Sequence, residues 1–237
     1  LHCVTTGYGN VGVGSCALRG SAAMEGYGNV GIGYCAGRNL TSATSNVLIG
    51  QTAGGSLTTG SNNVGIGGQT LTTITDKSGE IAIGYATLKS NVTGGDNTAI
   101  GYQSQCKSNA CHNTSVGKFT LMCNTEGTCS VAIGSEALRY NTCGDGNVGI
   151  GYNALRCGTT SCYNTAVGTH AGRVITTGCY NNALGSCALY TVTTGGRNAA
   201  MGSWALFANT TGTGNVAVGH GVMECNTCGD NNTAIGR

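Results

Sequence analysis

The chain repeats a short pattern of apolar and small residues, separated by longer polar stretches of nearly constant length. Each repeat typically opens on Asn, continues with Val or Thr, then Gly or Ala, then Ile or Val, and closes on Gly. Eleven of the thirteen intervals between closing glycines are 17 residues, and the other two are 19 and 16. The closing glycines are Gly14, Gly33, Gly50, Gly67, Gly84, Gly101, Gly117, Gly134, Gly151, Gly168, Gly185, Gly202, Gly219 and Gly236. Alternation with a period of two predicts one short strand per repeat, and the fixed longer period predicts stacked coils.

Residues at equivalent places of successive repeats form columns. The residue before each closing Gly is aliphatic or Met in all fourteen repeats, which predicts a continuous buried ladder. The Gly or Ala before it faces the other way. If the aliphatic residues fill the interior, the small column makes a flat outer face. If the small column points inward instead, the aliphatic ladder packs against a partner. Both arrangements predict one shared apolar face.

Two further columns have a structural interpretation. A small residue and often a Leu follow each closing Gly, as in Ala17-Leu18 and Ala154-Leu155, and predict a second, shorter strand or extended segment before the turn. The opening Asn of the motif appears in twelve of the fourteen repeats, with Glu80 and Ser130 in the other two. Stacked Asn side chains can hydrogen-bond along a ladder. Alternatively, the Asn is a turn residue with a left-handed φ.

These columns predict an all-β fold, a single parallel β-solenoid (β-roll) of about 14 coils with a 17-residue repeat. No repeat lacks the motif, so residues 1–237 are expected to form one solenoid domain. Seventeen residues at ~3.3 Å each enclose a narrow, flattened roll and no pore.

Composition narrows the function classes. The chain has 43 Gly and no Pro, and only 8% of its residues are charged, which excludes a disordered chain and collagen. A net charge of +2 gives no support for nucleic acid, and no apolar run is long enough for membrane insertion. The nine carboxylates recur in no paired column, and no helix is expected after the Gly-rich motifs to form a phosphate loop. We therefore expect no enzyme and no cofactor.

The motif resembles known repeats. Asn97-Thr98-Ala99-Ile100-Gly101-Tyr102 and the segment 147–155 resemble repeats of phage tail-fibre-like proteins, and Ser130-Val131-Ala132-Ile133-Gly134 is similar to the head repeat of trimeric autotransporter adhesins. The resemblance covers the whole chain at the level of the motif. It implies a left-handed parallel β-roll, with three chains side by side, displayed outside a cell or virion. The cysteine content and the lack of a recognisable stalk, anchor or chaperone domain depart from that pattern.

The 14 cysteines favour an oxidising compartment. Residues of one column lie ~4.8 Å apart in adjacent coils, within the Cα range of a disulfide. Column matching, within one residue for the second and third pairs, predicts four ladder disulfides: Cys16–Cys35, Cys106–Cys123, Cys111–Cys129 and Cys162–Cys179. The alternatives are free thiols and, for Cys225 and Cys228 with His220, a zinc site that lacks a fourth ligand.

Several surface columns could bind partners. A basic stripe lies five places after the closing Gly, and it is either a solvated corner or a site for an anionic polymer. It consists of Arg19, Arg38, Lys89, Arg139, Arg156 and Arg173. Tyr34, Tyr85, Tyr102 and Tyr152 follow the Gly directly and form either a packing ladder or a sugar platform. Glycosylation sequons in expected exposed turns begin at Asn39, Asn91, Asn209 and Asn231, and a fifth, at Asn113, lies in the motif ladder.

We expect a structural subunit of an extracellular, cell-surface or virion-surface fibre that assembles with copies of itself. The alternative is an adhesin or receptor-binding tail-fibre module with a surface glycan or receptor as partner; an ice-binding solenoid, suggested by the paired threonines from Thr159 to Thr211, is a weaker alternative. The chain begins without Met, which favours a processed start or a segment of a longer chain. The register from Gly236 to Leu1 of a following copy nearly continues one coil, which predicts head-to-tail stacking and an intersubunit Cys3–Cys225 disulfide.

Overall fold

The computed structural model describes residues 6–20 and 24–237. Fourteen strands of three residues follow in chain order in a parallel sheet, and the described residues contain no helix, so none that could span a membrane. The predicted β-solenoid is confirmed. The chain is compact in two units, Leu1–Asn113 and Thr114–Arg237. Each is described by itself.

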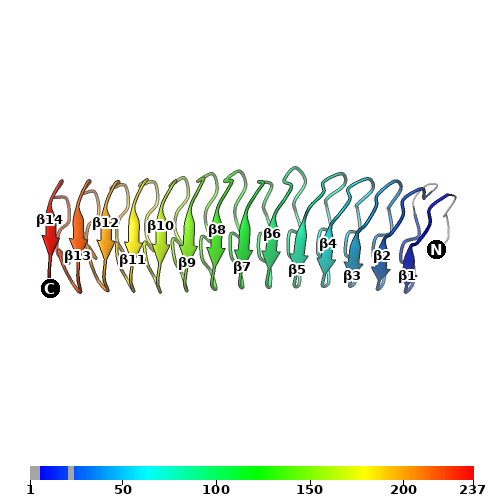
Figure 1. The fold of residues 1–237 in the computed structure, drawn as a ribbon, viewed down its shortest axis with the longest axis horizontal. Helices are drawn as coiled ribbons and strands as arrows, with labels where there is room; N and C mark the ends of the chain where they lie inside the picture. Colours follow the sequence, from blue (N-terminus) through cyan, green and yellow to red (C-terminus); the bar gives the residue numbers. More distant parts are fainter. Residues whose placement is uncertain (1–5, 21–23) are drawn as a thin grey trace. The chain divides into compact units, whose positions relative to one another are not determined.

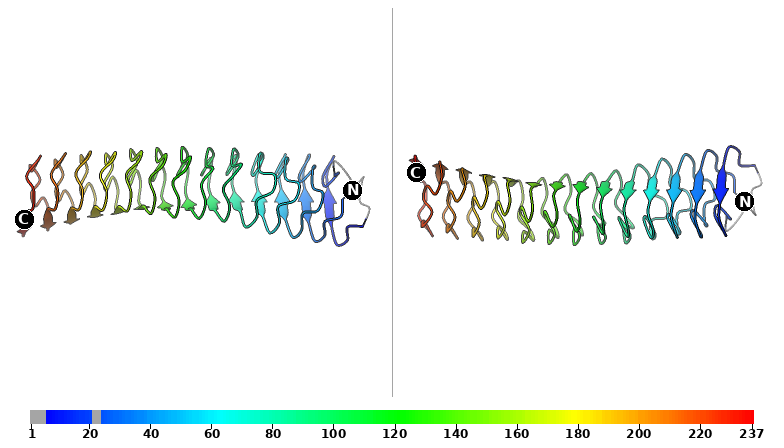
Figure 2. Two further views of the ribbon diagram at one scale, coloured as in Figure 1. Left: turned by 90° about the horizontal axis from the view of Figure 1, so that it is seen from above. Right: turned by 90° about the horizontal axis from the view of Figure 1, so that it is seen from below.

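Every strand coincides with the three residues before a closing glycine. In the first unit the strands are β1 (Val11–Val13), β2 (Val30–Ile32), β3 (Val47–Ile49), β4 (Val64–Ile66), β5 (Ile81–Ile83) and β6 (Thr98–Ile100). In the second they are β7 (Thr114–Val116), β8 (Val131–Ile133), β9 (Val148–Ile150), β10 (Thr165–Val167), β11 (Asn182–Leu184), β12 (Ala199–Met201), β13 (Val216–Val218) and β14 (Thr233–Ile235). Within each unit the strands of successive coils lie side by side, and turns complete each coil (Figures 1 and 2).

The pairing register follows the repeat. Thr165 pairs with Val148 on one side and with Asn182 on the other, each one repeat of 17 residues away. A parallel sheet in which each residue pairs with its own column aligns like side chains from coil to coil. Every property of one column is thereby repeated as a line along the unit.

The small column points inward, and the aliphatic column before the closing Gly faces outward. Ala166, Ala183 and Ala200 are fully or almost fully buried, whereas Val167, Leu184 and Met201 are 37–44% exposed. The expectation of a continuous buried Ile/Val ladder is therefore wrong, and the alternative of a thinner roll holds. The cause is volume: the Leu side chains that follow the closing Gly occupy the interior, so only Gly or Ala fits opposite them in most coils. A Cβ on Gly149 would already lie 3.3 Å from Cγ of Leu138.

The segment after each closing Gly is a turn, so the prediction of a second extended strand is wrong. The second and fourth residues after the Gly take a left-handed conformation, as Glu136 (φ 62) and Leu138 (φ 52) do. Their backbone groups still bond between coils: the Leu155 N–H donates to the Ala171 carbonyl at 3.0 Å. The left-handed residues at these alternate positions bend the chain sharply and direct the Leu side chain into the interior.

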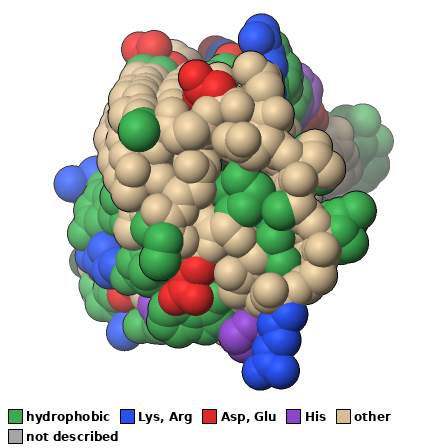
Figure 3. All heavy atoms as spheres, turned by 90° about the vertical axis from the view of Figure 1, so that its left-hand side faces the viewer, with side chains coloured by type: hydrophobic (Ala, Val, Ile, Leu, Met, Phe, Trp, Pro, Cys, Tyr) green, Lys and Arg blue, Asp and Glu red, His purple; other side chains and the backbone are tan. Residues whose placement is uncertain are grey.

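The interior of each unit is therefore lined by the small strand column and by the residues of this turn. Leu18, Leu48 and Leu71 are fully buried in the first unit, and Leu121, Leu138 and Leu155 in the second. Seen from the end that carries β14, charged side chains lie mainly at the periphery (Figure 3).

The Asn ladder is confirmed. Asn164 Oδ1 accepts hydrogen bonds from the backbone N–H of Asn181 at 2.9 Å and from its Nδ2 at 3.1 Å. The same contacts join Asn181 to Asn198, at 3.1 and 3.0 Å. The rival interpretation is wrong, because the left-handed residue is the one before the Asn, for example Tyr180 (φ 62). Buried amides that satisfy one another fix the register of the coils.

Glu80 interrupts this ladder with a buried carboxyl group. Its backbone N–H still donates to Asn63 Oδ1 at 2.9 Å, and its Oε1 accepts from Nδ2 of Asn91 and Asn97 at 3.0 and 3.2 Å. Oε2 is buried and has no partner. Burial raises the pKa of Glu80 from 4.5 to about 8, although the two amide donors oppose the shift. The carboxyl group is therefore mainly protonated at neutral pH.

This raised pKa predicts alkaline sensitivity. The stabilisation is complete below the unfolded pKa of 4.5 and is lost as pH rises through about 8. Glu80→Gln should raise the free energy of unfolding by roughly 3 kcal/mol at pH 8 and change it little at pH 4. Urea unfolding at several pH values measures this, with Glu126→Gln as a surface control. If the free energy of unfolding depends on pH equally in the wild type and in Glu80→Gln, the raised pKa of Glu80 is contradicted.

Candidate functional site: the outer face of the sheet

The outer face of the sheet is the largest regular surface that the columns create. Two residues per strand point outward, and in the second unit most are aliphatic. Among them Ile133, Leu184 and Met201 are 39%, 40% and 44% exposed. Only the polar Asn182 and the threonines of three strands interrupt the aliphatic character. We call the outward residues of β7–β14 the outer face.

On the outer face, the exposed side chains of adjacent strands join into one continuous apolar strip. Eight strands at ~4.8 Å spacing, each presenting two outward side chains, give an apolar strip on the order of 300–400 Å². The largest apolar patch on a typical monomer is about 300–600 Å² and is often functional, so a regular strip of this size is a candidate contact surface. No charged residue stands in any strand of the second unit, so nothing on the strip itself opposes apolar packing.

The family models, the curated proteins and the solved structures give no match to this chain. The resemblance to tail-fibre and adhesin repeats stays an expectation.

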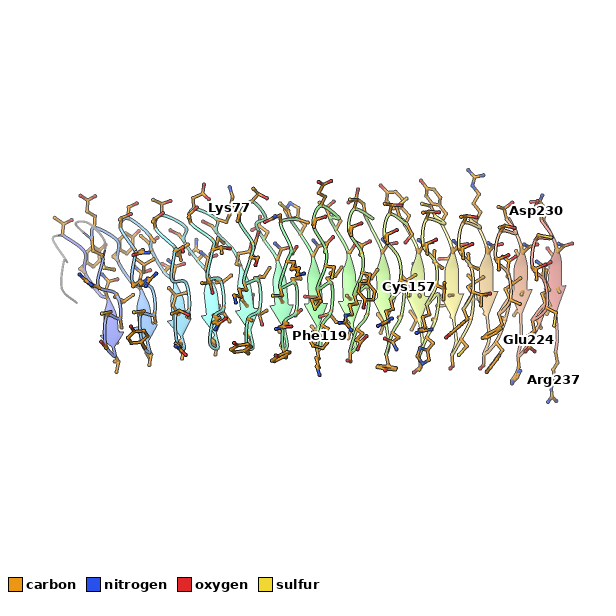
Figure 4. All side chains as sticks on the ribbon, turned by 180° about the vertical axis from the view of Figure 1, so that it is seen from behind. Lys77, Phe119, Cys157, Glu224, Asp230 and Arg237 are labelled. Atoms are coloured by element: carbon orange, nitrogen blue, oxygen red, sulfur yellow. The ribbon has the colours of Figure 1, made fainter. Side chains whose placement is uncertain are left out.

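Part of the basic stripe lies at the corner where the strands end, which Phe119 marks in Figure 4. In the second unit Arg139 and Arg156 share Glu136, with N–O distances of 3.0 and 2.7 Å to Oε2. The hydrogen bond from Arg156 lowers the pKa of Glu136. Both guanidinium groups also lie over the Tyr140 ring. These arginines are engaged in a packed network, which favours the solvated-corner interpretation for this part of the stripe.

The remaining basic residues have different surroundings. Arg19 and Arg38 are exposed and line a hollow of about 410 Å³ with Tyr34. Lys89 donates to Gln69 Oε1 at 2.8 Å, and Arg173 lies over the Tyr190 ring with 5.4 Å to its centroid. The six basic residues therefore do not act as one uniform charged line.

One pair of the tyrosine column stacks between adjacent coils. Tyr85 and Tyr102 stack with ring centroids 5.6 Å apart and 18° between their planes, as predicted. Tyr152 contacts His170 edge to face at 5.3 Å. Stacking covers one face of each ring, which favours the packing interpretation for the Tyr85–Tyr102 pair.

Two predicted cysteine pairs lie side by side. The Cys162 N–H donates to Cys179 Sγ at 3.2 Å, and Cys16 lies within hydrogen-bonding reach of Cys35. Burial raises the pKa of the Cys162 thiol to about 11, whereas the hydrogen bond from Ser15 lowers that of Cys16. Because the thiolate is the reactive form, Cys16–Cys35 should oxidise the faster at neutral pH.

The Cys162–Cys179 disulfide should stabilise the oxidised protein by about 3 kcal/mol, since it closes a loop of one repeat. Replacing both cysteines with Ser, or reducing the wild type, should remove that increment. Urea unfolding with and without reductant measures it, and Cys143→Ser, an exposed cysteine, is the control. Finding Cys162 and Cys179 as free thiols by non-reducing peptide mapping of the secreted or air-oxidised protein would contradict the prediction.

The other two predicted ladder pairs each have one cysteine in each unit. Cys106 and Cys111 belong to the first unit, and Cys123 and Cys129 to the second. Counted from the closing glycines, Cys111 stands six places before Gly117 and Cys129 five before Gly134, so they occupy neighbouring columns. Cys3 lies outside the described residues, and its predicted partner Cys225 is exposed. Among the described residues no group of three or more His, Cys, Asp or Glu is placed to hold a metal ion, Cys225 and Cys228 included.

Two of the four predicted glycosylation sites are inaccessible. Asn91 and Asn209 are fully buried, and their Nδ2 groups donate to the carbonyls of Gly94 and Gly212 at 3.1 and 3.0 Å. The prediction of exposed turns is wrong there, because these residues turn inward and cap the turn. Asn39 is half-buried and Asn231 is exposed, so both stay candidates.

The first threonine of each paired turn faces the neighbouring coil. Thr159 Oγ1 donates to the Thr176 carbonyl at 3.3 Å, and Thr176 Oγ1 to the Thr193 carbonyl at 3.0 Å. The second threonines, such as Thr177 and Thr194, are exposed. Each pair therefore contributes one hydroxyl to the fold and one to solvent.

Proposed function

We propose that the protein is a structural subunit of an extracellular or virion-surface fibre, in which copies associate laterally through the outer face. The observation that carries the proposal is the exposure of Val167, Leu184 and Met201 on adjacent strands of a regular, uncharged strip. Their burial against the same strip of another copy would remove this apolar surface from water. A repeat with one conserved geometry per coil lets two or more copies match over many strands.

The remaining features support a structural role. Asn, Thr and aromatic ladders each stabilise the stacking of one coil on the next. The adjacent cysteines can add covalent links between coils in an oxidising compartment. The expected head-to-tail stacking rests on the repeat register and stays a prediction.

Replacing Leu184 and Met201 together with Lys should convert the associated wild type to a monomer. The substituted side chains point to solvent, so the coil itself should still fold. Sedimentation velocity at increasing concentration measures the association, and Ser186→Lys, on an exposed turn residue, is the control. A wild type that sediments as a monomer at tens of micromolar would contradict the proposal, because a contact with a micromolar dissociation constant, about 8 kcal/mol of binding free energy, would be largely formed at that concentration.

A further inference from the structure

The column six places before the closing Gly forms a partial side-chain to backbone ladder at the corner before the strands. In the second unit the Thr128 N–H donates to Asp145 Oδ1 at 2.6 Å, and the Thr213 N–H to Asp230 Oδ1 at 2.6 Å. The Cys162 N–H donates to Cys179 Sγ in the same way. Each side chain thus satisfies a backbone donor of the preceding coil. Asp230 marks this corner in Figure 4.

Gly196 interrupts this ladder. It stands in the same column and has no side chain, so the Cys179 N–H has no acceptor among the described residues. A Cβ on Gly196 would lie 3.6 Å from the Cys179 nitrogen, in the place that the missing acceptor would fill. The interruption therefore leaves the Cys179 N–H without an acceptor, beside a residue that carries no side chain.

The space beside Gly196 is a hollow of about 340 Å³, within the lower range of small-ligand sites. Tyr180 forms one wall: one face of its ring stacks on Tyr163, with centroids 5.3 Å apart, and the coil of Arg197 lies on its other side. Thr177, Thr194 and Arg197 complete the lining with hydroxyl groups and a cation. Tyr180 is 54% exposed.

The charge of the hollow selects an anion. Arg197 is exposed and forms no ion pair within residues 6–20 and 24–237, and no carboxylate lines the space. The nearest acid of the column, Asp230, is already engaged by Thr213. One guanidinium is too little charge for a nucleic acid, whose binding depends on several phosphate contacts. It suits a single carboxylate, which a guanidinium can hold through two hydrogen bonds.

We propose that this hollow binds a carboxylate-bearing sugar unit of a glycan. The carboxylate accepts from Arg197 and from the Cys179 N–H. The ring lies against Tyr180, and its hydroxyl groups bond to Thr177 and Thr194. The site goes beyond the structural role proposed above and does not depend on association through the outer face, which lies on different columns.

Titration calorimetry with methyl glucuronide, methyl glucoside and sodium sulfate tests the site on the full chain. The glucuronide should bind with a dissociation constant on the order of 1 mM, at least ~10-fold more tightly than the other two probes. Sulfate that binds as tightly as the glucuronide would reduce the site to a plain anion site and overturn the proposal. The absence of measurable glucuronide binding would overturn it as well. So would displacement of bound glucuronide by a single-stranded oligonucleotide.

Two variants separate binding from folding. Arg197→Gln should weaken glucuronide binding by ~10-fold or more and leave glucoside binding unchanged. Gly196→Ser should abolish glucuronide binding, because the new hydroxyl can accept the hydrogen bond of the Cys179 N–H in place of the ligand. The melting temperature should stay the same or rise, since Ser61 and Ser78 accept the backbone N–H of the preceding coil in the same way. A Cβ on Gly196 would come 2.8 Å from the Cys179 carbonyl oxygen, so a small backbone shift is needed. Arg173→Gln, at the other corner, is the control. Unchanged glucuronide binding in both variants would contradict the assignment.

Discussion

Replacing Gly151 with Ala is expected to lower the free energy of unfolding by about 3–5 kcal/mol. Gly151 closes its repeat at φ +131, a conformation that residues with a Cβ rarely adopt. A Cβ would also lie 2.5 Å from the carbonyl oxygen of Gly168 in the next coil. Since both atoms belong to hydrogen-bonded coils, neither can move without disturbing the stack. Urea unfolding of the variant measures the loss.

Gly149→Ala is the matched control for this change. Gly149 is two residues away, in the small column of β9, and has no left-handed φ. Its neighbours in the sheet, Ala132 and Ala166, already carry the added methyl group. The control should change stability by less than ~1 kcal/mol. An equal loss of unfolding free energy in the two variants would contradict this account. It would show that neither the room for a Cβ nor the φ angle makes the closing glycine a requirement.

Replacing Asn181 with Ala is expected to cost roughly 3–5 kcal/mol. Its Nδ2 donates to Asn164 Oδ1 and to the Gly195 carbonyl, and its Oδ1 accepts two hydrogen bonds from Asn198. All of these groups are buried, so the substitution leaves the two Asn198 donors without their acceptor and removes a donor from Asn164 Oδ1 and from the Gly195 carbonyl. The damage should extend to the adjacent coils, and hydrogen exchange should rise at Asn198.

The neighbouring Asn182 supplies the control, because it is the same residue type on the opposite face. Asn182 is exposed on β11 and its side chain takes no part in the ladder. Asn182→Ala should change stability by less than ~0.5 kcal/mol. A similar loss in both variants would mean that the ladder contributes no more than an ordinary surface amide.

The position of every strand could be predicted from the sequence, because the closing glycine recurs at a nearly fixed interval and the strand precedes it. The Asn ladder could also be foreseen, since an amide that recurs in one column of a parallel stack meets its own copies. Glu80 stood out for the same reason, as a carboxyl group in a column of amides.

The inward direction of the small column could not be derived from alternation. Alternation separates Ala183 from Leu184 but does not say which lies inside, and both are apolar. The deciding quantity is the volume left in the roll once Leu189 and its equivalents are folded in. That depends on the left-handed turn, which the residues Cys187 and Leu189 do not themselves favour. The available signal was the occasional Gly at the same two places, as at Gly172 and Gly221.

The surface sites were harder to predict than the fold. Sequons at Asn91 and Asn209 follow the local sequence rule, but the turn directs both side chains inward. The hollow beside Arg197 arises from the absence of a side chain at Gly196. Gly196 adds no side chain to a recurring pattern; with Gly95 it is one of two glycines in a column where several side chains accept backbone N–H groups.

Electron cryomicroscopy of the purified chain at its native concentration tests the central claim most directly. The proposal predicts particles in which several copies lie side by side, with the strands β7–β14 of each copy turned toward a shared interior and Leu184 and Met201 buried there. Particles of single chains, or copies that touch only through the turn corners and leave the outer face in solvent, would contradict it.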